Sequence, residues 1–244
     1  QVTRFAAPNL LLGNTIVLKA AEDAPLTILK MAEVCAEFLP AGVLNVVTGY
    51  GAEIGEALVT HPGVDKVSFT GSSLVGKMVG GKAANRMAHL SLELGGKSAF
   101  IVLDDADIGS ACAMAAFNVV THAGQGCAIT TRLVVPRGSL DEAITATRDA
   151  MAGLPAGDPT DGGTICGPVI SARQRQRIES YIELATSEGG TIEIGGGRPA
   201  DKEKGFFVEP TLISGLDNSA RVGQEEIFGP VLVIIAHDGD DDAI

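Results

Sequence analysis

A single cysteine lies in an unusually bare part of the sequence. Cys127 follows Gly124 and Gly126 in the stretch THAGQGCAITTRLVVP, just ahead of an apolar run. A nucleophilic cysteine needs room for its substrate, and its backbone N–H can help to hold an oxyanion. Glycines supply that room and permit backbone angles that other residues avoid. On composition alone a loop cysteine is more often incidental than catalytic, so the nucleophile hypothesis needs support from the rest of the chain.

A carboxylate also lies next to glycines, in the stretch SLELGGKS. Glu93 lies between Leu92 and Leu94, just before two glycines. On an alternating strand this side chain would face solvent. The alternative is half-burial, which would suit the carboxylate to general-base work. The residue by itself leaves both interpretations open.

Residues 71–78, GSSLVGKM, nearly match the phosphate-binding sequence G-x-x-x-x-G-K-[ST], with Gly71 and Gly76 as its glycines. Met78 stands where that motif needs a hydroxyl to hold Mg²⁺, which weakens a nucleotide-hydrolysing function. A helix that starts at Gly71 and Ser72 would still present free N–H groups and its positive dipole end to a phosphate. Ser72 is equally compatible with a simple helix N-cap.

A cation and a carboxylate flank another short turn. Lys19 ends an apolar, strand-like segment, and Glu22 follows it. Both groups could reach the hydroxyls of a ribose from such a strand end. A solvated pair of turn residues is the plainer alternative, and we favour it without further context.

The histidines and the other cysteines indicate no second catalytic site and no metal site. His122 lies close to Cys127, which invites a Cys–His hydrolase interpretation, but in such enzymes the fold brings a distant histidine to the cysteine. The remaining histidines lack metal-ligand spacing, so we expect no metal site. Cys35 and Cys112 lie within apolar helical segments and Cys166 precedes an apolar loop, where we expect structural roles.

Alternating strand-like and helix-like segments position these residues. In the first part of the chain we expect strands at 14–19, 44–47, 66–70, 89–94 and 99–103, with helices at 26–38, at 52–60 and from 71 onward. Repeated strand–helix–strand units indicate a doubly wound α/β fold with a parallel sheet. Ligands of such sheets bind at the carboxyl ends of the strands, so the turns after Lys19, Thr70 and Leu94 are the candidate positions.

The pattern changes after residue 105. We expect an Ala-rich helix at 107–122 leading to the cysteine loop, a strand at 133–135, helices at 140–154 and 172–188, and a buried strand at the end of EEIFGPVLVIIAH. A domain boundary falls at the glycines of residues 92–98, which divides the chain into residues 1–95 and 96–244.

Composition narrows the possible partners. The 244 residues include 30 acidic and 18 basic side chains, a net charge of −12, which argues against nucleic acid or anionic lipid as a partner. No apolar run approaches the roughly 20 residues of a membrane helix, and the first residues lack the order of a signal peptide. Four cysteines without a C-x-x-C pair favour a reduced, cytoplasmic setting.

Five stretches occur in a characteristic order: GNTIVLKAAEDAP, FTGSSLVG, LELGGKS, GQGC and EEIFGP. Each is modest alone, but together, at these spacings, they resemble the aldehyde dehydrogenase superfamily, in its NAD(P)-dependent, non-acylating branch. The resemblance runs from about Asn9 to the end of the chain. It implies an α/β fold in which residues 1–95 form part of a doubly wound NAD-binding domain and residues 96–244 form an α/β catalytic domain, truncated at its C-terminus.

The resemblance implies oxidation of an aldehyde to a carboxylic acid. Cys127 would attack the aldehyde carbonyl to give a thiohemiacetal, and loss of hydride to the nicotinamide would leave a thioester. Glu93 would activate the water that hydrolyses this thioester. The presence of Glu93 argues against the CoA-acylating branch, whose members generally lack that glutamate.

The resemblance also implies a cofactor site. Its members in this sequence are Lys19 and Glu22 at the adenosine ribose, Gly71 and Ser72 at the pyrophosphate with Gly76 in the same stretch, Glu226 at the nicotinamide ribose, and Phe228 near the nicotinamide ring. A carboxylate near the ribose 2′ position accepts a hydroxyl but repels a 2′-phosphate, so Glu22 favours NAD over NADP.

Three departures from the family pattern bear on activity. Gly126 replaces a residue that usually carries a side chain, and Ile129 is bulkier than the small residue usual at its position. The family's oxyanion-holding asparagine would lie upstream of residue 1, so we expect the chain to be an internal part of a longer protein and, by itself, to bind NAD poorly and to turn over slowly or not at all. The resemblance implies that the full-length protein is a homo-dimer or homo-tetramer. Losing one oxyanion donor costs roughly 10²–10³ in rate.

Two other functions stay open. One is a non-catalytic family member that binds nucleotide or has a structural role, and the Cys127 and Glu93 pair weighs against it. The other, more remote, is a phosphate-transfer ATPase, which Met78 weakens.

Overall fold

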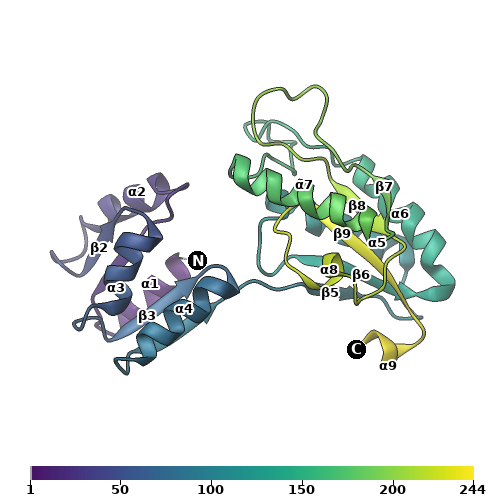
Figure 1. Ribbon diagram of the computed structural model, residues 1–244. Helices are drawn as coiled ribbons and strands as arrows, with labels where there is room; N and C mark the ends of the chain where they lie inside the picture. Colours follow the sequence, from purple (N-terminus) through teal and green to yellow (C-terminus); the bar gives the residue numbers. More distant parts are fainter. Residues whose placement is uncertain (1) are drawn as a thin grey trace. The chain divides into compact units, whose positions relative to one another are not determined.

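The computed structural model describes residues 2–244, whose helices and strands form two units, one ending at Gly95 and the other running from Gly96 to Ile244 (Figure 1). Both units combine helices with strands, and nearly all strand pairs are parallel. The predicted α/β class with parallel sheets is confirmed.

The first unit contains two small parallel sheets. Its elements are α1 (Val2–Leu11), β1 (Ile16–Lys19), α2 (Leu26–Cys35), β2 (Leu44–Val47), a π-helical turn (Gly51–Gly55), α3 (Glu56–Thr60), β3 (Lys66–Thr70), α4 (Ser73–Ala84) and β4 (His89–Glu93). Strand β1 pairs with β2, and β3 pairs with β4. The register places Lys19 beside Val47 and Thr70 beside Glu93, so the strand ends that carry candidate residues meet in pairs.

The predicted strands of this unit are confirmed, and one helix was missed. Helix α1 was not predicted, and it contains Pro8 in its interior. Proline lacks an N–H and normally ends a helix, so a sequence pattern argues against an element here. The predicted helix at 26–38 is shorter than expected and ends at Cys35.

The second unit is built on one five-stranded sheet with the order β5-β6-β9-β8-β7. Its elements are β5 (Ser98–Ile101), α5 (Ile108–Val120), a 3₁₀ turn (Thr121–Gly124), β6 (Thr130–Pro136), a second 3₁₀ turn (Arg137–Ser139), α6 (Leu140–Ala152), α7 (Ala172–Ser187), β7 (Thr191–Ile194), β8 (Thr211–Ser214), α8 (Arg221–Gln224), β9 (Val231–His237) and α9 (Asp240–Ala243). Only β7 runs antiparallel to its neighbour.

The sheet order explains the apolar run near the end of the chain. Strand β9 lies at the centre, between β6 and β8, and Val231–Ile235 are all buried. A strand covered on both faces reads as a continuous apolar segment rather than as an alternating one. Helices α5 and α6 pack against each other and against this sheet, and α7 packs against β7 and α8.

Several boundaries in this unit differ from the prediction. The expected helix at 107–122 ends at Val120, because Thr121 has an extended ψ of 132° and His122 and Ala123 have positive φ. Strand β6 is longer than the expected 133–135, and the short helix α8 was not predicted. Within residues 2–244, no helix has both the length and the apolar character needed to cross a bilayer.

Candidate active site

A left-handed segment of backbone presents Cys127. His122, Ala123 and Gly124 have φ values of 53°, 52° and 70°, a run that turns the chain sharply after α5. Gln125 then fixes the loop, because its Oε1 accepts the Ile170 N–H at 3.0 Å. Three left-handed residues in succession are costly, so this loop needs the contacts that surround it.

Cys127 itself lies in a tight turn that is partly buried. The Ile129 N–H donates to the Gly126 carbonyl oxygen at 3.2 Å, which places Cys127 at the second position of the turn. Gly126 and Ile129, the two departures from the family pattern, fit one another. A Cβ on Gly126 would lie 2.8 Å from Ile129 Cδ1, so the isoleucine occupies the space that a side chain at residue 126 would need.

The cysteine lines a cavity of about 330 Å³ formed entirely within the second unit. Its lining residues come from the end of α5, the cysteine loop and the start of β6: Asn118, Thr121, His122, Gly126, Cys127, Ala128, Ile129 and Thr130. This volume suits a small organic molecule. The structure therefore places the predicted nucleophile on a ligand-sized hollow.

Glu226 and the cysteine loop both contact Gly96. The Gly96 N–H donates to Glu226 Oε1 at 3.3 Å, and the Cβ position of Gly96 lies 3.9 Å from the Cys127 carbonyl oxygen. Phe228, two residues after Glu226, has a φ of 62°, which is a strained conformation for an aromatic residue. Two predicted site residues, Cys127 and Glu226, thus both lie close to Gly96.

Lys97 is a polar residue of this region that sequence analysis missed. Its Nζ is buried and has no hydrogen-bond partner among residues 2–244. Burial and the positive charge of Arg132 lower the pKa of Lys97 to about 7, although the Glu226 carboxylate acts in the opposite direction. The available signal was a cation directly after two glycines, just before strand β5.

Helix α7 carries two further residues that the sequence did not point out. Gln174 Nε2 donates to the carbonyl oxygens of Ile227 at 3.1 Å and Phe228 at 2.8 Å. Arg177 Nη2 donates to the Glu226 carbonyl oxygen at 2.6 Å. These contacts hold the backbone of the stretch EEIFGP against the helix.

In the first unit, Lys19 and Glu22 form one polar cluster at the end of β1. Lys19 Nζ lies 3.2 Å from Glu22 Oε1 and donates to the carbonyl oxygens of Ala20 at 2.9 Å and Gly49 at 3.1 Å. Glu22 Oε1 also accepts the Gly51 N–H at 2.6 Å. Hydrogen bonds from the Glu22 backbone, Lys19 and Gly51 lower the pKa of Glu22 against a smaller effect of burial. The glutamate is therefore a carboxylate at neutral pH.

The residues of the phosphate-like stretch stand at the start of α4. Ser72 is the N-cap, and its Oγ accepts the Val75 N–H at 3.3 Å. The Gly71 N–H donates to the Glu93 carbonyl oxygen at 3.1 Å, continuing the β3–β4 ladder. Gly76 is buried, and a Cβ there would lie 2.5 Å from Leu94 Cδ2, so this glycine lets α4 approach the strand that ends in Glu93.

Glu93 is partly buried at the end of β4, with 32% of its side chain exposed. The structure therefore agrees with the half-buried alternative for Glu93 rather than with the solvent-facing one. Glu93 Oε1 lies 3.5 Å from Nη2 of Arg4, which comes from α1. The carboxylate therefore has a charged partner from a helix that the sequence did not predict.

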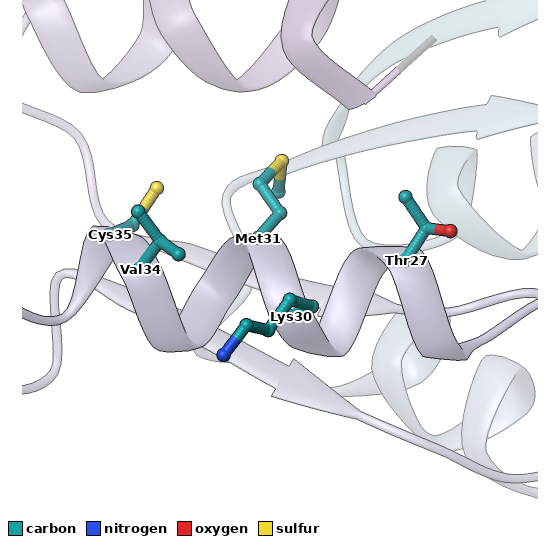
Figure 2. Close-up of a pocket in the computed structure, with 5 residues that line it drawn as sticks. All are labelled: Thr27, Lys30, Met31, Val34 and Cys35. Carbon is teal, nitrogen blue, oxygen red and sulfur yellow. The ribbon is translucent and has the colours of Figure 1, made fainter.

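The structure gives less support for a metal site or for a second ligand site. Among residues 2–244, no group of three or more His, Cys, Asp or Glu side chains is arranged to hold a metal ion. A second hollow, of about 450 Å³, follows one face of α2 and is lined by Thr27, Lys30, Met31, Val34 and Cys35 (Figure 2). Its one charged group, Lys30, is already paired with Glu33 at 2.8 Å, and the remaining lining offers few polar groups to orient a ligand.

The whole chain matches one protein family. The aldehyde dehydrogenase family model covers residues 1–244. The chloroplastic aminoaldehyde dehydrogenase of Arabidopsis thaliana is 44% identical over 239 residues, which is 98% of this chain and 48% of the plant protein. The chain thus spans about half the length of the curated relatives that it matches.

Solved structures agree in fold. Aldehyde dehydrogenase C of Pseudomonas syringae, a cysteine-to-alanine mutant in complex with NAD⁺ and octanal, superposes with a TM-score of 0.97 at 38% identity, over 99% of this chain and 50% of that one. The Mycobacterium tuberculosis aldehyde dehydrogenase in complex with NAD⁺ has a TM-score of 0.94 at 49% identity, over 97% of this chain and 49% of that one. With this fold, and with the five sequence stretches in their order, the chain belongs to the aldehyde dehydrogenase family.

Proposed function

We propose that the protein oxidises an aldehyde to a carboxylic acid with NAD as the hydride acceptor, and that Cys127 is the nucleophile. The observation that carries the proposal is the position of this cysteine, in a tight turn on a cavity of about 330 Å³. Family membership supports the reaction class. The plant relative is an aminoaldehyde dehydrogenase, and the bacterial structure contains octanal.

The turn at Cys127 suits the addition step. The sulfur attacks the aldehyde carbonyl carbon, the new C–S bond forms, and negative charge develops on the carbonyl oxygen. The Cys127 N–H has no hydrogen-bond acceptor among residues 2–244, so this donor is available to that oxyanion. Loss of hydride from the resulting thiohemiacetal leaves a thioester on the sulfur.

We assign the hydrolytic step to Glu93, on the basis of its resemblance to the family's general base. The carboxylate takes a proton from a water molecule, which then adds to the thioester carbonyl and releases the acid and the thiol. The Glu93 side chain is 32% exposed, so a water molecule can reach the carboxylate at the end of β4. Arg4 Nη2 lies 3.5 Å from the carboxylate as its charged neighbour.

We propose that residues of each unit contribute to holding a dinucleotide. When bound, NAD accepts the hydride. In the first unit, the N-terminus of α4 after Gly71 and Ser72 offers N–H groups suited to a pyrophosphate. Glu22 and Lys19 would hold the adenosine ribose, and the charge on Glu22 favours NAD over NADP. In the second unit, Glu226 and Phe228 would hold the nicotinamide ribose and ring.

The predicted cytoplasmic location and homo-oligomeric state stay predictions. For the oligomer, we propose a dimer or tetramer by analogy with the family. Size-exclusion chromatography with light scattering of the complete native polypeptide would test it, and a monomer would contradict it.

A direct assay tests the proposed function. The complete native polypeptide is incubated with NAD and a panel of aliphatic, amino and aromatic aldehydes, and NADH absorbance is followed. We expect turnover with at least one aldehyde, and its loss in Cys127→Ala. Full dehydrogenase activity in Cys127→Ser would show that the nucleophile is another residue. NAD binding without any turnover would favour the non-catalytic alternative.

A further inference from the structure

The loop that carries Glu226 and Phe228 is conformationally strained. Phe228 has a φ of 62°, a left-handed conformation that is strained for a residue other than glycine. Such a conformation persists only where surrounding contacts determine it. The contacts that hold this loop therefore decide where the two side chains point.

One stripe of α7 provides those contacts. Gln174, Arg177 and Tyr181 lie three and four residues apart, so they share one face of the helix. Gln174 and Arg177 bind the backbone carbonyl oxygens of Glu226, Ile227 and Phe228, as described above. Arg177 Nη2 also donates to the Tyr181 hydroxyl at 3.2 Å, and its guanidinium lies 4.9 Å from the centre of the Tyr181 ring.

Tyr181 connects this stripe to the residue before Glu226. Its hydroxyl donates to Glu225 Oε2 at 2.5 Å. Arg221 of α8 binds the same carboxylate with two hydrogen bonds, from Nε at 3.1 Å and from Nη2 at 3.0 Å. Glu225, the residue that follows α8, is therefore held from two helices.

The charges keep this arrangement in one protonation state. The hydrogen bonds from Arg221 and then from Tyr181 lower the pKa of Glu225 to about 2. Burial, followed by the hydrogen bond to Glu225, raises the pKa of Tyr181 above its usual value. At neutral pH the tyrosine is consequently a donor and the glutamate a charged acceptor.

We propose that Tyr181 and Glu225 are positioning residues for the cofactor: through Arg177 and the loop backbone, they fix Glu226 and Phe228 in the geometry that binds the nicotinamide half of NAD. Neither is a catalytic residue. This inference rests on the proposed function, because it takes Glu226 as a cofactor contact. It assigns a task to Tyr181, which lies outside the five sequence stretches, and to Glu225, the first residue of EEIFGP.

The test uses Tyr181→Phe and Glu225→Gln in the complete native polypeptide, with NAD affinity from fluorescence titration and steady-state kinetics. A hydrogen bond to a charged group contributes about 1.5–3 kcal/mol, and 1.4 kcal/mol is ten-fold in affinity. We expect the Kd and KM for NAD to rise about ten-fold, while kcat at saturating NAD and the KM for the aldehyde change less than about two-fold. The matched control is Glu183→Gln on the exposed part of α7. This variant should leave the Kd and the KM for NAD unchanged.

A third variant separates this inference from the proposed function. If Glu226→Gln weakens NAD binding but Tyr181→Phe and Glu225→Gln do not, the positioning role is wrong and the cofactor role of Glu226 stands. If the wild-type protein does not bind NAD, both the positioning role of Tyr181 and Glu225 and the cofactor role of Glu226 are wrong. A fall in kcat and in both affinities together, in step with a lower Tm, would show that Tyr181 and Glu225 only stabilise the fold.

Discussion

The backbones of Gly124 and Gly229 lie in direct contact, so that a Cβ on Gly124 would lie 2.0 Å from the Gly229 carbonyl oxygen. A Cβ on Gly229 would in turn lie 2.4 Å from Ile178 Cδ1 of α7. The cysteine loop thus packs on the loop of Glu226 and Phe228, which packs on α7. At Gly124 the obstacle is backbone, which cannot move aside, whereas at Gly229 it is the fully buried side chain of Ile178.

A side chain at Gly124 should therefore be poorly tolerated. Gly124→Ala meets the Gly229 backbone and must also adopt a φ of 70°. Overpacking costs about 1–3 kcal/mol and a left-handed alanine adds about 1 kcal/mol, so we expect the free energy of unfolding to fall by about 2–4 kcal/mol. Denaturant unfolding measures it. The control is Gly138→Ala, where a Cβ meets nothing within 4 Å. Equal stabilities of the two variants would contradict the contact.

Gly126 and Ile129 should be energetically coupled. Gly126→Ala alone places a Cβ 2.8 Å from Ile129 Cδ1, and we expect a loss of about 1–2 kcal/mol. In an Ile129→Ala background the same substitution should cost close to nothing, since the obstructing atoms are gone. A double-mutant cycle of unfolding free energies gives the coupling energy directly. Additive effects would show that the two residues do not share this space.

Lys97 should make stability depend on pH. Its pKa is about 7 in the folded protein and 10.5 in the unfolded chain, so between these values the unfolded chain binds more protons. The free energy of unfolding should consequently rise as pH increases from about 7 towards 10, and the cost of the buried charge is fully present below pH 7. In Lys97→Met that rise should disappear, and the variant should be the more stable protein at pH 6. The exposed Lys204→Met is the control. Parallel pH curves for wild type and Lys97→Met would refute the assignment.

The four cysteines should differ in reactivity. Burial raises the pKa of Cys166 to about 11 and also raises that of Cys112, whereas Cys127 and Cys35 are only partly buried. Iodoacetamide at pH 8 should therefore label Cys127 and Cys35 first, because the thiolate is the reactive form. Mass spectrometry follows all four sites in one sample, with Cys35 as the internal reference. NAD should change the labelling rate of Cys127 relative to Cys35. Labelling of Cys166 as fast as that of Cys127 would contradict this order.

Glu22 should control the choice between NAD and NADP. Its carboxylate is charged at neutral pH and would repel a ribose 2′-phosphate. In Glu22→Gln we expect the ratio of NAD to NADP affinity to fall about ten-fold or more, since like charges in contact cost more than 1 kcal/mol. Glu33→Gln on α2 removes an exposed carboxylate, also paired with a lysine, and serves as the control. An unchanged ratio would place the 2′ position elsewhere.

Local patterns in the sequence determined the class of fold and the kinds of chemistry available. Central strands such as β9 are continuous apolar runs because both of their faces are buried, and this signal is visible without a structure. Cys127 and Glu93 could be singled out because each interrupts the pattern around it. The departures at Gly126 and Ile129 were visible too, but as two separate oddities.

Only the tertiary structure decided how these residues are held. It shows that Ile129 fills the space beside Gly126, that Phe228 adopts a left-handed conformation, and that Gln174 binds its carbonyl oxygen across a separation of 54 residues. It also shows the helix that carries Arg4, in spite of Pro8. Sequence periodicity reports whether a segment is buried, averaged over several residues. Which backbone atom meets which side chain depends on packing between distant segments, and that is fixed only when the chain has folded.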